Sequence, residues 1–105
     1  IYVKDNADAI INVAFNGKKN ETYNIGTNKD FTNISLVKKI CKIMVNNFGF
    51  NKKIYNLITY VKDRPGHDYK YKMDCKKIKK DLNWTPKLNF ENAIKETIKW
   101  YLIKK

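Results

Sequence analysis

The sequence predicts an α/β protein with about four helices and two or three short strands. Two observations lead to this prediction: apolar residues recur at helical spacing in four stretches, and short β-favouring runs lie between them. The chain has 105 residues, of which 43% are hydrophobic and 13% aromatic, which fits one domain over residues 1–105. Because two or three short strands are marginal alone, we expect them to complete a larger sheet.

The first predicted helix spans residues 5–16, where apolar residues repeat at intervals of three and four. Asp5 would cap its N-terminus, and Gly17 would end it in a left-handed conformation. The run ETYNIG at residues 21–26 follows and is a strand candidate closed by glycine.

The second helix gives the clearest periodic signal. Thr32 or Asn33 can cap it, and Gly49 ends it. Its apolar stripe consists of Ile34, Val37, Ile40, Cys41, Met44, Val45 and Phe48.

The C-terminal half predicts one more strand and two more helices. ITYV at residues 58–61 is the strand candidate, and residues 74–82 form a short lysine-rich helix. After a turn, a last helix capped by Asn89 spans about residues 90–103.

The composition bounds the function classes. The formal charge of +12 allows a small basic nucleic-acid-binding module, but the lysines are spread from Lys4 to Lys105, which favours a solvated surface in a lysine-rich composition. Cys41 and Cys75 lack CxxC spacing, so no disulfide framework is expected. No metal site is expected either, because one histidine and scattered carboxylates do not supply a ligand set. No apolar run is long enough to cross a bilayer, so we expect no membrane association and a cytoplasmic location.

The motif DRPGHD, residues 63–68, holds the only arginine and the only histidine of the chain. An arginine guanidinium can bind two phosphate oxygens at once, which a lysine ammonium cannot do, so Arg64 is a candidate phosphate-binding residue. Gly66 permits positive φ and a close backbone approach, and His67 adds a donor from the same turn. These residues indicate an anion-binding loop suited to a diphosphate, with a plain Pro-Gly surface turn as the alternative.

The motif also carries a family resemblance. VKDRPGHDYKYKMD and the following KKIKKDLNWTPKLNFENAIKETIKWYL resemble the C-terminal part of the dTDP-glucose 4,6-dehydratases, and the opening IYVKDNADAI resembles a helix start of their superfamily. That superfamily is the extended short-chain dehydrogenase/reductases, Rossmann-type NAD-dependent epimerases and dehydratases. Lys70 and Lys72 depart from the family pattern, which leaves phosphate contact at residue 70 in doubt.

The resemblance implies a function for the parent enzyme. It would be a hydro-lyase that oxidises the sugar of dTDP-glucose at C4 with bound NAD, eliminates water across C5 and C6, and returns the hydride to C6. The product would be dTDP-4-dehydro-6-deoxy-glucose, a precursor of deoxysugars such as rhamnose. The present chain would be its C-terminal nucleotide-sugar-binding portion and inactive alone, and the parent enzyme would be a homodimer.

The resemblance also implies which residues do what. Asp63, Arg64, Pro65, Gly66 and His67 would bind the nucleotide-sugar, with Arg64 and His67 nearest the diphosphate. Asn33 would touch the nucleotide portion, although from the sequence alone it is a helix cap. The NAD-binding loop and the catalytic residues are expected upstream of Ile1, because the four glycines are too far apart for a dinucleotide fingerprint.

Three alternatives remain open from the sequence: another nucleotide-sugar epimerase or decarboxylase of the superfamily, the basic nucleic-acid-binding module, and a stand-alone nucleotide-sugar binder without catalysis.

Overall fold

The computed structural model describes residues 1–27, 29–67 and 73–103. Within these ranges the chain folds into four α-helices and one 3-10 helix. In order, they are α1 (Val3–Asn16), α2 (Asn33–Phe48), η1 (Lys52–Leu57), α3 (Lys76–Leu82) and α4 (Phe90–Ile103). The Lys70 and Lys72 departures lie outside the described residues.

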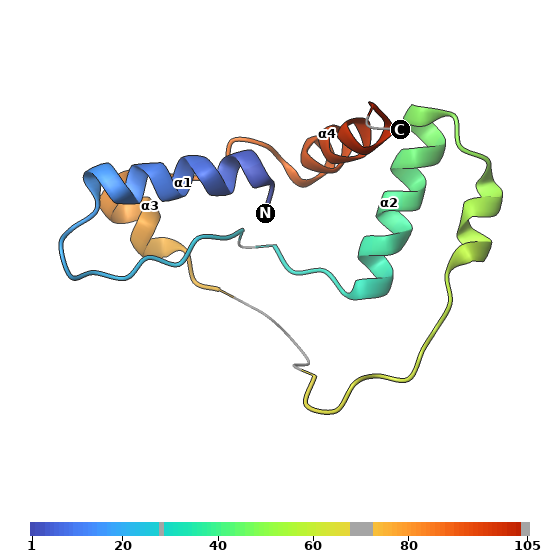
Figure 1. Cartoon of the computed structure of the whole chain (residues 1–105), viewed down its shortest axis with the longest axis horizontal. Helices are drawn as coiled ribbons and strands as arrows, with labels where there is room; N and C mark the ends of the chain where they lie inside the picture. The colour runs from blue at the N-terminus through green and yellow to red at the C-terminus, as the bar shows by residue number, and fades with distance from the viewer. Residues whose placement is uncertain (28, 68–72, 104–105) are drawn as a thin grey trace.

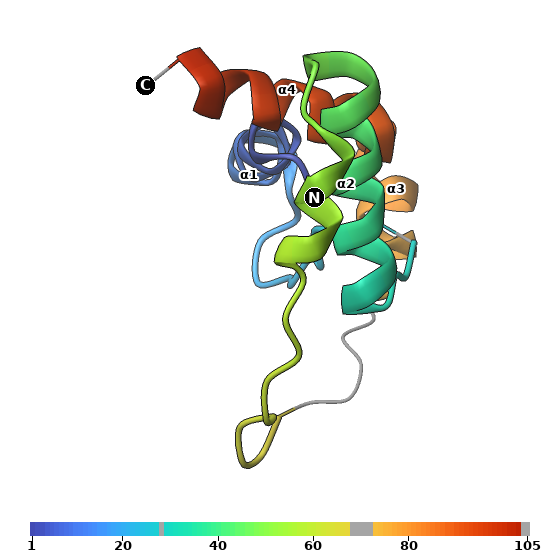
Figure 2. The ribbon, with the colours of Figure 1, turned by 90° about the vertical axis from the view of Figure 1, so that its right-hand side faces the viewer.

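The helices form two groups that α4 links (Figure 1). At one end α1 contacts α3, and at the other α2 contacts both η1 and α4. The segment that follows η1 extends away from the helices and carries the 63–67 turn at its tip (Figures 1 and 2). The molecule measures 51 × 36 × 21 Å, so it is a flat and open arrangement.

The predicted α/β class is wrong for this chain: no strand occurs among residues 1–27, 29–67 and 73–103. The two strand candidates, residues 21–26 and 58–61, form neither helix nor strand. A strand exists only when a second strand supplies the other half of its hydrogen-bond ladder. Within the described ranges, neither segment pairs with another strand. Tyr60 and Val61 are instead more than 80% exposed.

The four predicted helices are confirmed, but some of the predicted caps are wrong. Thr32 caps α2 by accepting a hydrogen bond from the Ser35 amide, and Asn89 caps α4 in the same way through the Asn92 amide. Gly49 ends α2 at φ +70°, as predicted. Gly17 does not adopt the left-handed conformation, since its φ is −67°; it is needed because a Cβ there would lie 2.4 Å from the Val13 carbonyl oxygen.

Asp5 is not the N-cap of α1, because the helix begins at Val3 after Tyr2. Its side chain is 4% exposed and accepts hydrogen bonds from the amides of Lys87 at 3.2 Å and Leu88 at 3.3 Å. The carboxylate therefore satisfies two backbone donors in the turn that leads into α4.

The main core is small and joins α1 to α3. It consists of Ala9, Cys75, Ile78 and Trp84, all less than 8% exposed. The indole nitrogen of Trp84 donates to Asp8 at 3.0 Å, which satisfies the one polar group that this large side chain carries into the core. Cys41 is also buried, as its place in the apolar stripe of α2 predicts.

Candidate functional site

A cleft of about 1180 Å³ lies between the two helix groups. It is bordered by the segment before α2, by α3, and by the first half of α4. Small-molecule sites usually occupy about 300–1,000 Å³, so the cleft has room for a ligand as large as a nucleotide-sugar. Two of the residues predicted to bind substrate, Asn33 and His67, are among the described residues that line it.

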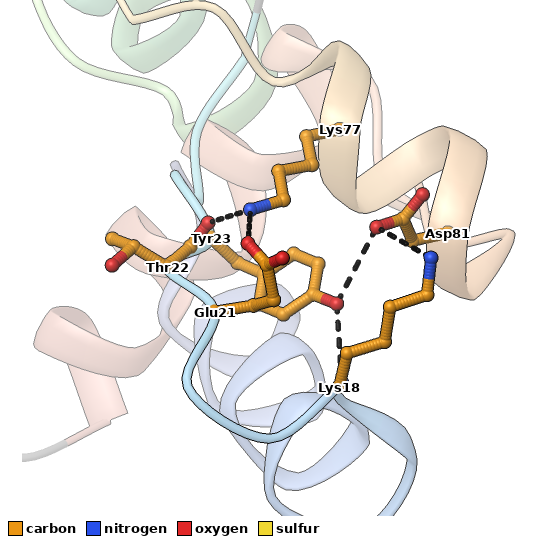
Figure 3. Close-up of polar contacts among 6 residues, drawn as sticks. All are labelled: Lys18, Glu21, Thr22, Tyr23, Lys77 and Asp81. Atoms are coloured by element: carbon orange, nitrogen blue, oxygen red, sulfur yellow. Dashed lines mark hydrogen bonds and ion pairs between the residues drawn. The ribbon is translucent and has the colours of Figure 1, made fainter.

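One side of the cleft is the segment that precedes α2, and a set of contacts with α3 fixes it (Figure 3). Lys77 pairs with Glu21 and donates to the Thr22 carbonyl oxygen at 2.9 Å. The Tyr23 hydroxyl accepts from the amide of Lys18 and donates to Asp81. The hydrogen bond to Glu21 raises the pKa of Lys77, so its ammonium stays charged. These contacts hold residues 18–23 against α3.

Gly26 follows this segment where it meets the core. A Cβ at this position would lie 3.3 Å from the Cys75 sulfur, so glycine permits the close approach of the chain to the start of α3. Burial raises the pKa of the Cys75 thiol, with a smaller contribution from the charge of Asp74. Cys75 also lines the cleft, and its thiol is neutral there.

Two helix N-termini border the cleft, one through Thr32 and Asn33 and the other through Asn89 and Phe90. A helix N-terminus carries a partial positive charge and amides without intrahelical partners, which suits an anion. Thr32, and not Asn33, is the cap of α2. The Asn33 side chain is exposed and makes no hydrogen bond to another described residue.

Aromatic and cationic side chains complete the cleft. The Phe31 and Phe90 rings lie 4.5 Å apart between centroids, and the Lys39 ammonium lies 5.3 Å from the centre of the Phe31 ring. Among the described residues that line the cleft, the cations are Lys29, Lys79 and Lys87. Lys87 is paired with Asp8 at 3.0 Å, whereas Lys79 has no ion-pair partner in the described ranges.

The other four predicted site residues lie in an exposed turn beside His67. Asp63 accepts a hydrogen bond from the Arg64 amide at 2.8 Å, and Gly66 has φ +69°, as predicted for the residue after proline in such a turn. The Arg64 Nε donates to His67 Nδ1 at 3.1 Å, so a hydrogen bond joins the two side chains. Of the two, His67 is partly buried and lines the cleft, and Arg64 is exposed.

The sequence did not single out Lys29, Lys79 or Phe31 as site residues. The two lysines are indistinguishable in sequence from the other 19, because the chain uses lysine for all its cations except Arg64. Phe31 stands directly before the cap of α2, which is the only local signal that could have marked it.

Comparison with known proteins identifies the family. Residues 1–97 match the family described as GDP-mannose 4,6 dehydratase. The chain belongs to this family.

Several proteins that are similar to this chain are named dTDP-glucose 4,6-dehydratase. The protein from Haemophilus influenzae is 41% identical over 106 residues, that from Shigella flexneri 43% over 102, and that from Neisseria gonorrhoeae 40% over 107. Each comparison covers 97% of this chain but only 28–31% of the relative. The resemblance to dTDP-glucose 4,6-dehydratases predicted from the sequence is therefore confirmed, and the chain spans about three-tenths of the length of these relatives.

No helix in the described ranges is both long and apolar enough to cross a membrane. The same ranges contain no group of three or more His, Cys, Asp or Glu side chains that could hold a metal ion.

Proposed function

We propose that this chain is the C-terminal, nucleotide-sugar-binding portion of a dTDP-glucose 4,6-dehydratase. The observation that supports it most directly is the cleft that Asn33 and His67 line, with two helix N-termini and the cation of Lys79 at its border. GDP-mannose and dTDP-glucose, the compounds named for the family and for the relatives, differ in base and sugar but share a nucleoside diphosphate. A site that neutralises a diphosphate is the feature that such proteins need in common.

Each part of the cleft has a role in this proposal. The amides at the start of α2 and the ammonium of Lys79 neutralise the diphosphate, and the Arg64 fork approaches it from the 63–67 turn. The free amide of Asn33 is available to the nucleotide portion. These residues bind and orient the substrate and break no bond, so their contribution is to affinity and alignment.

The cofactor belongs to another part of the enzyme in this proposal. NAD would supply the hydride acceptor and donor when bound, but it needs a glycine-rich loop at the start of a helix. Gly17, Gly26, Gly49 and Gly66 lie apart in sequence, and none precedes a helix as such a loop would. The residues of this chain do not fit NAD, and we assign them no step that involves it.

The remaining features of the proposal follow from the same resemblance. The complete enzyme would be a cytoplasmic homodimer acting on dTDP-glucose. The names of the relatives support this reading over a basic nucleic-acid-binding module, since all three are named for a nucleotide-sugar.

A pair of adjacent lysines on α3 tests the proposal. Lys79 lines the cleft and Lys80 does not, although both are exposed and both lie in the last turn of the helix. We expect Lys79→Ala to weaken dTDP binding to the complete enzyme about three- to tenfold, the effect of one solvent-accessible charge, in a calorimetric titration at low salt. Lys80→Ala should bind dTDP as the wild type does. Equal losses in both variants, or no dTDP binding by the wild type, would refute the proposal.

A further inference from the structure

The turn at residues 63–67 fixes the relation between Arg64 and His67. The Asp63 carboxylate accepts a hydrogen bond from the Arg64 amide at 2.8 Å. The positive φ of Gly66 turns the chain back, so that residue 67 lies beside residue 64. A Cβ at Gly66 would meet nothing within 4 Å, so glycine is required here by the backbone conformation alone. The 3.1 Å hydrogen bond from Arg64 Nε to His67 Nδ1 is made across this turn.

This hydrogen bond determines the tautomer of the imidazole. A guanidinium has only N–H donors, so His67 Nδ1 must accept with its lone pair, and the proton of the neutral ring must be on Nε2. The bond also uses the inner edge of the guanidinium. The two outer nitrogens, with four N–H groups, are left for another partner.

We infer that His67 is a positioning residue that acts on the diphosphate through Arg64, a proposal that rests on the proposed function. The arginine side chain is long and, in an exposed turn, would otherwise lose much rotamer freedom on binding. The imidazole acceptor holds the guanidinium in one orientation before the ligand arrives, so that its outer fork is ready for two phosphate oxygens. His67 can take this role because it is partly buried at the edge of the cleft, whereas Arg64 is not.

The competing explanation is that His67 touches the diphosphate itself through its Nε2–H. Both explanations predict that His67→Ala weakens binding, so that variant alone does not separate them. They differ in which ring nitrogen matters. An asparagine places its amide oxygen near the position of Nδ1, and a glutamine places its amide near Nε2. The Asn variant therefore keeps the acceptor for Arg64, and the Gln variant keeps the outer donor.

The experiment measures dTDP affinity by calorimetry and the KM and kcat for dTDP-glucose in the complete enzyme. We expect His67→Ala and His67→Gln each to weaken binding about tenfold, with a matching rise in KM and little change in kcat, the size expected for a misplaced charge-assisted pair. His67→Asn should recover most of this affinity. In an Arg64→Ala background, His67→Ala should add less than about a twofold further loss, because the two residues act as one unit.

Two results would overturn the inference: recovery by His67→Gln but not by His67→Asn, or losses that simply add in the double variant. Because the turn is exposed, we expect all variants to unfold at the wild-type temperature. If the Asn variant nevertheless fails to fold, the double variant still decides. A wild-type enzyme that does not bind dTDP would refute the proposed function instead, so the two failures are distinguishable.

Discussion

Replacing Asp5 by alanine tests whether the start of α1 fixes the turn that borders the cleft. The carboxylate is 4% exposed and accepts from the amides of Lys87 and Leu88. A hydrogen bond to a charged group contributes about 1.5–3 kcal/mol net. The two amides are only partly buried, so water can replace some of what the carboxylate supplies. Because the two distances, 3.2 and 3.3 Å, exceed the usual 2.9–3.0 Å, we take the lower end of that range. At about 1.5 kcal/mol for each of the two hydrogen bonds, the expected loss of unfolding free energy is about 3 kcal/mol.

The assay is urea unfolding of the 105-residue chain followed by tryptophan fluorescence, which reports on Trp84 in the core and on the more exposed Trp100. Asp5→Asn should lose about half as much, because its amide keeps one acceptor oxygen and turns one donor toward an amide N–H. The control is Asp8→Asn one helical turn away: Asp8 bonds Trp84 and Lys87 through side chains, and the Asn variant keeps an acceptor for the indole. A change of less than about 0.5 kcal/mol in Asp5→Ala, the size of an ordinary surface substitution, would refute the reasoning.

Three further predictions concern charge and reactivity. Arg64→Lys in the complete enzyme should raise the KM for dTDP-glucose about ten- to a hundredfold, since the bidentate fork is lost; an unchanged KM would contradict the assignment. Hydrogen bonds from Lys87 and Trp84 lower the pKa of Asp8. The charged Asp8 carboxylate therefore stabilises the folded chain above the ordinary carboxyl pKa, and this contribution is lost as the pH falls through the lower pKa of the folded state. Between about pH 5 and pH 2 the wild type should lose more stability than Asp8→Asn in urea titrations, and parallel losses would exclude this linkage. Cys75, buried and with a raised pKa, should react with iodoacetamide at pH 8 at least about tenfold more slowly than a free thiol, and dTDP should slow it further. Cys41, which lies outside the cleft, should not respond to dTDP; a Cys75 rate that dTDP leaves unchanged would argue against ligand binding here.

The helices were predictable because their signals are local. A helix satisfies its backbone within four residues, so the apolar period and the caps at Asn89 and Gly49 could be read from short windows of sequence. The two candidate strands were not predictable in this way. A strand depends on hydrogen bonds to a partner that can be anywhere in the chain, so the β-favouring composition of residues 21–26 and 58–61 did not suffice to make either of them a strand.

Of the candidate site, the sequence singled out the unusual residues and not the common ones. Arg64 and His67 stood out because each occurs once, and the structure joins them by a hydrogen bond. Lys79 could not be separated from 20 other lysines before α3 was placed beside the cleft. Asp5 was mistaken for a cap because its two partners lie more than 80 residues away, a separation that no local pattern records.

The central claim is that a diphosphate binds where the cleft meets the 63–67 turn. A crystal structure of the complete protein with dTDP tests it most directly. We predict phosphate oxygens about 2.7–3.0 Å from the outer nitrogens of Arg64, with the nucleotide beside Asn33 at the start of α2. A diphosphate bound elsewhere, with the Arg64 fork facing solvent, would contradict it.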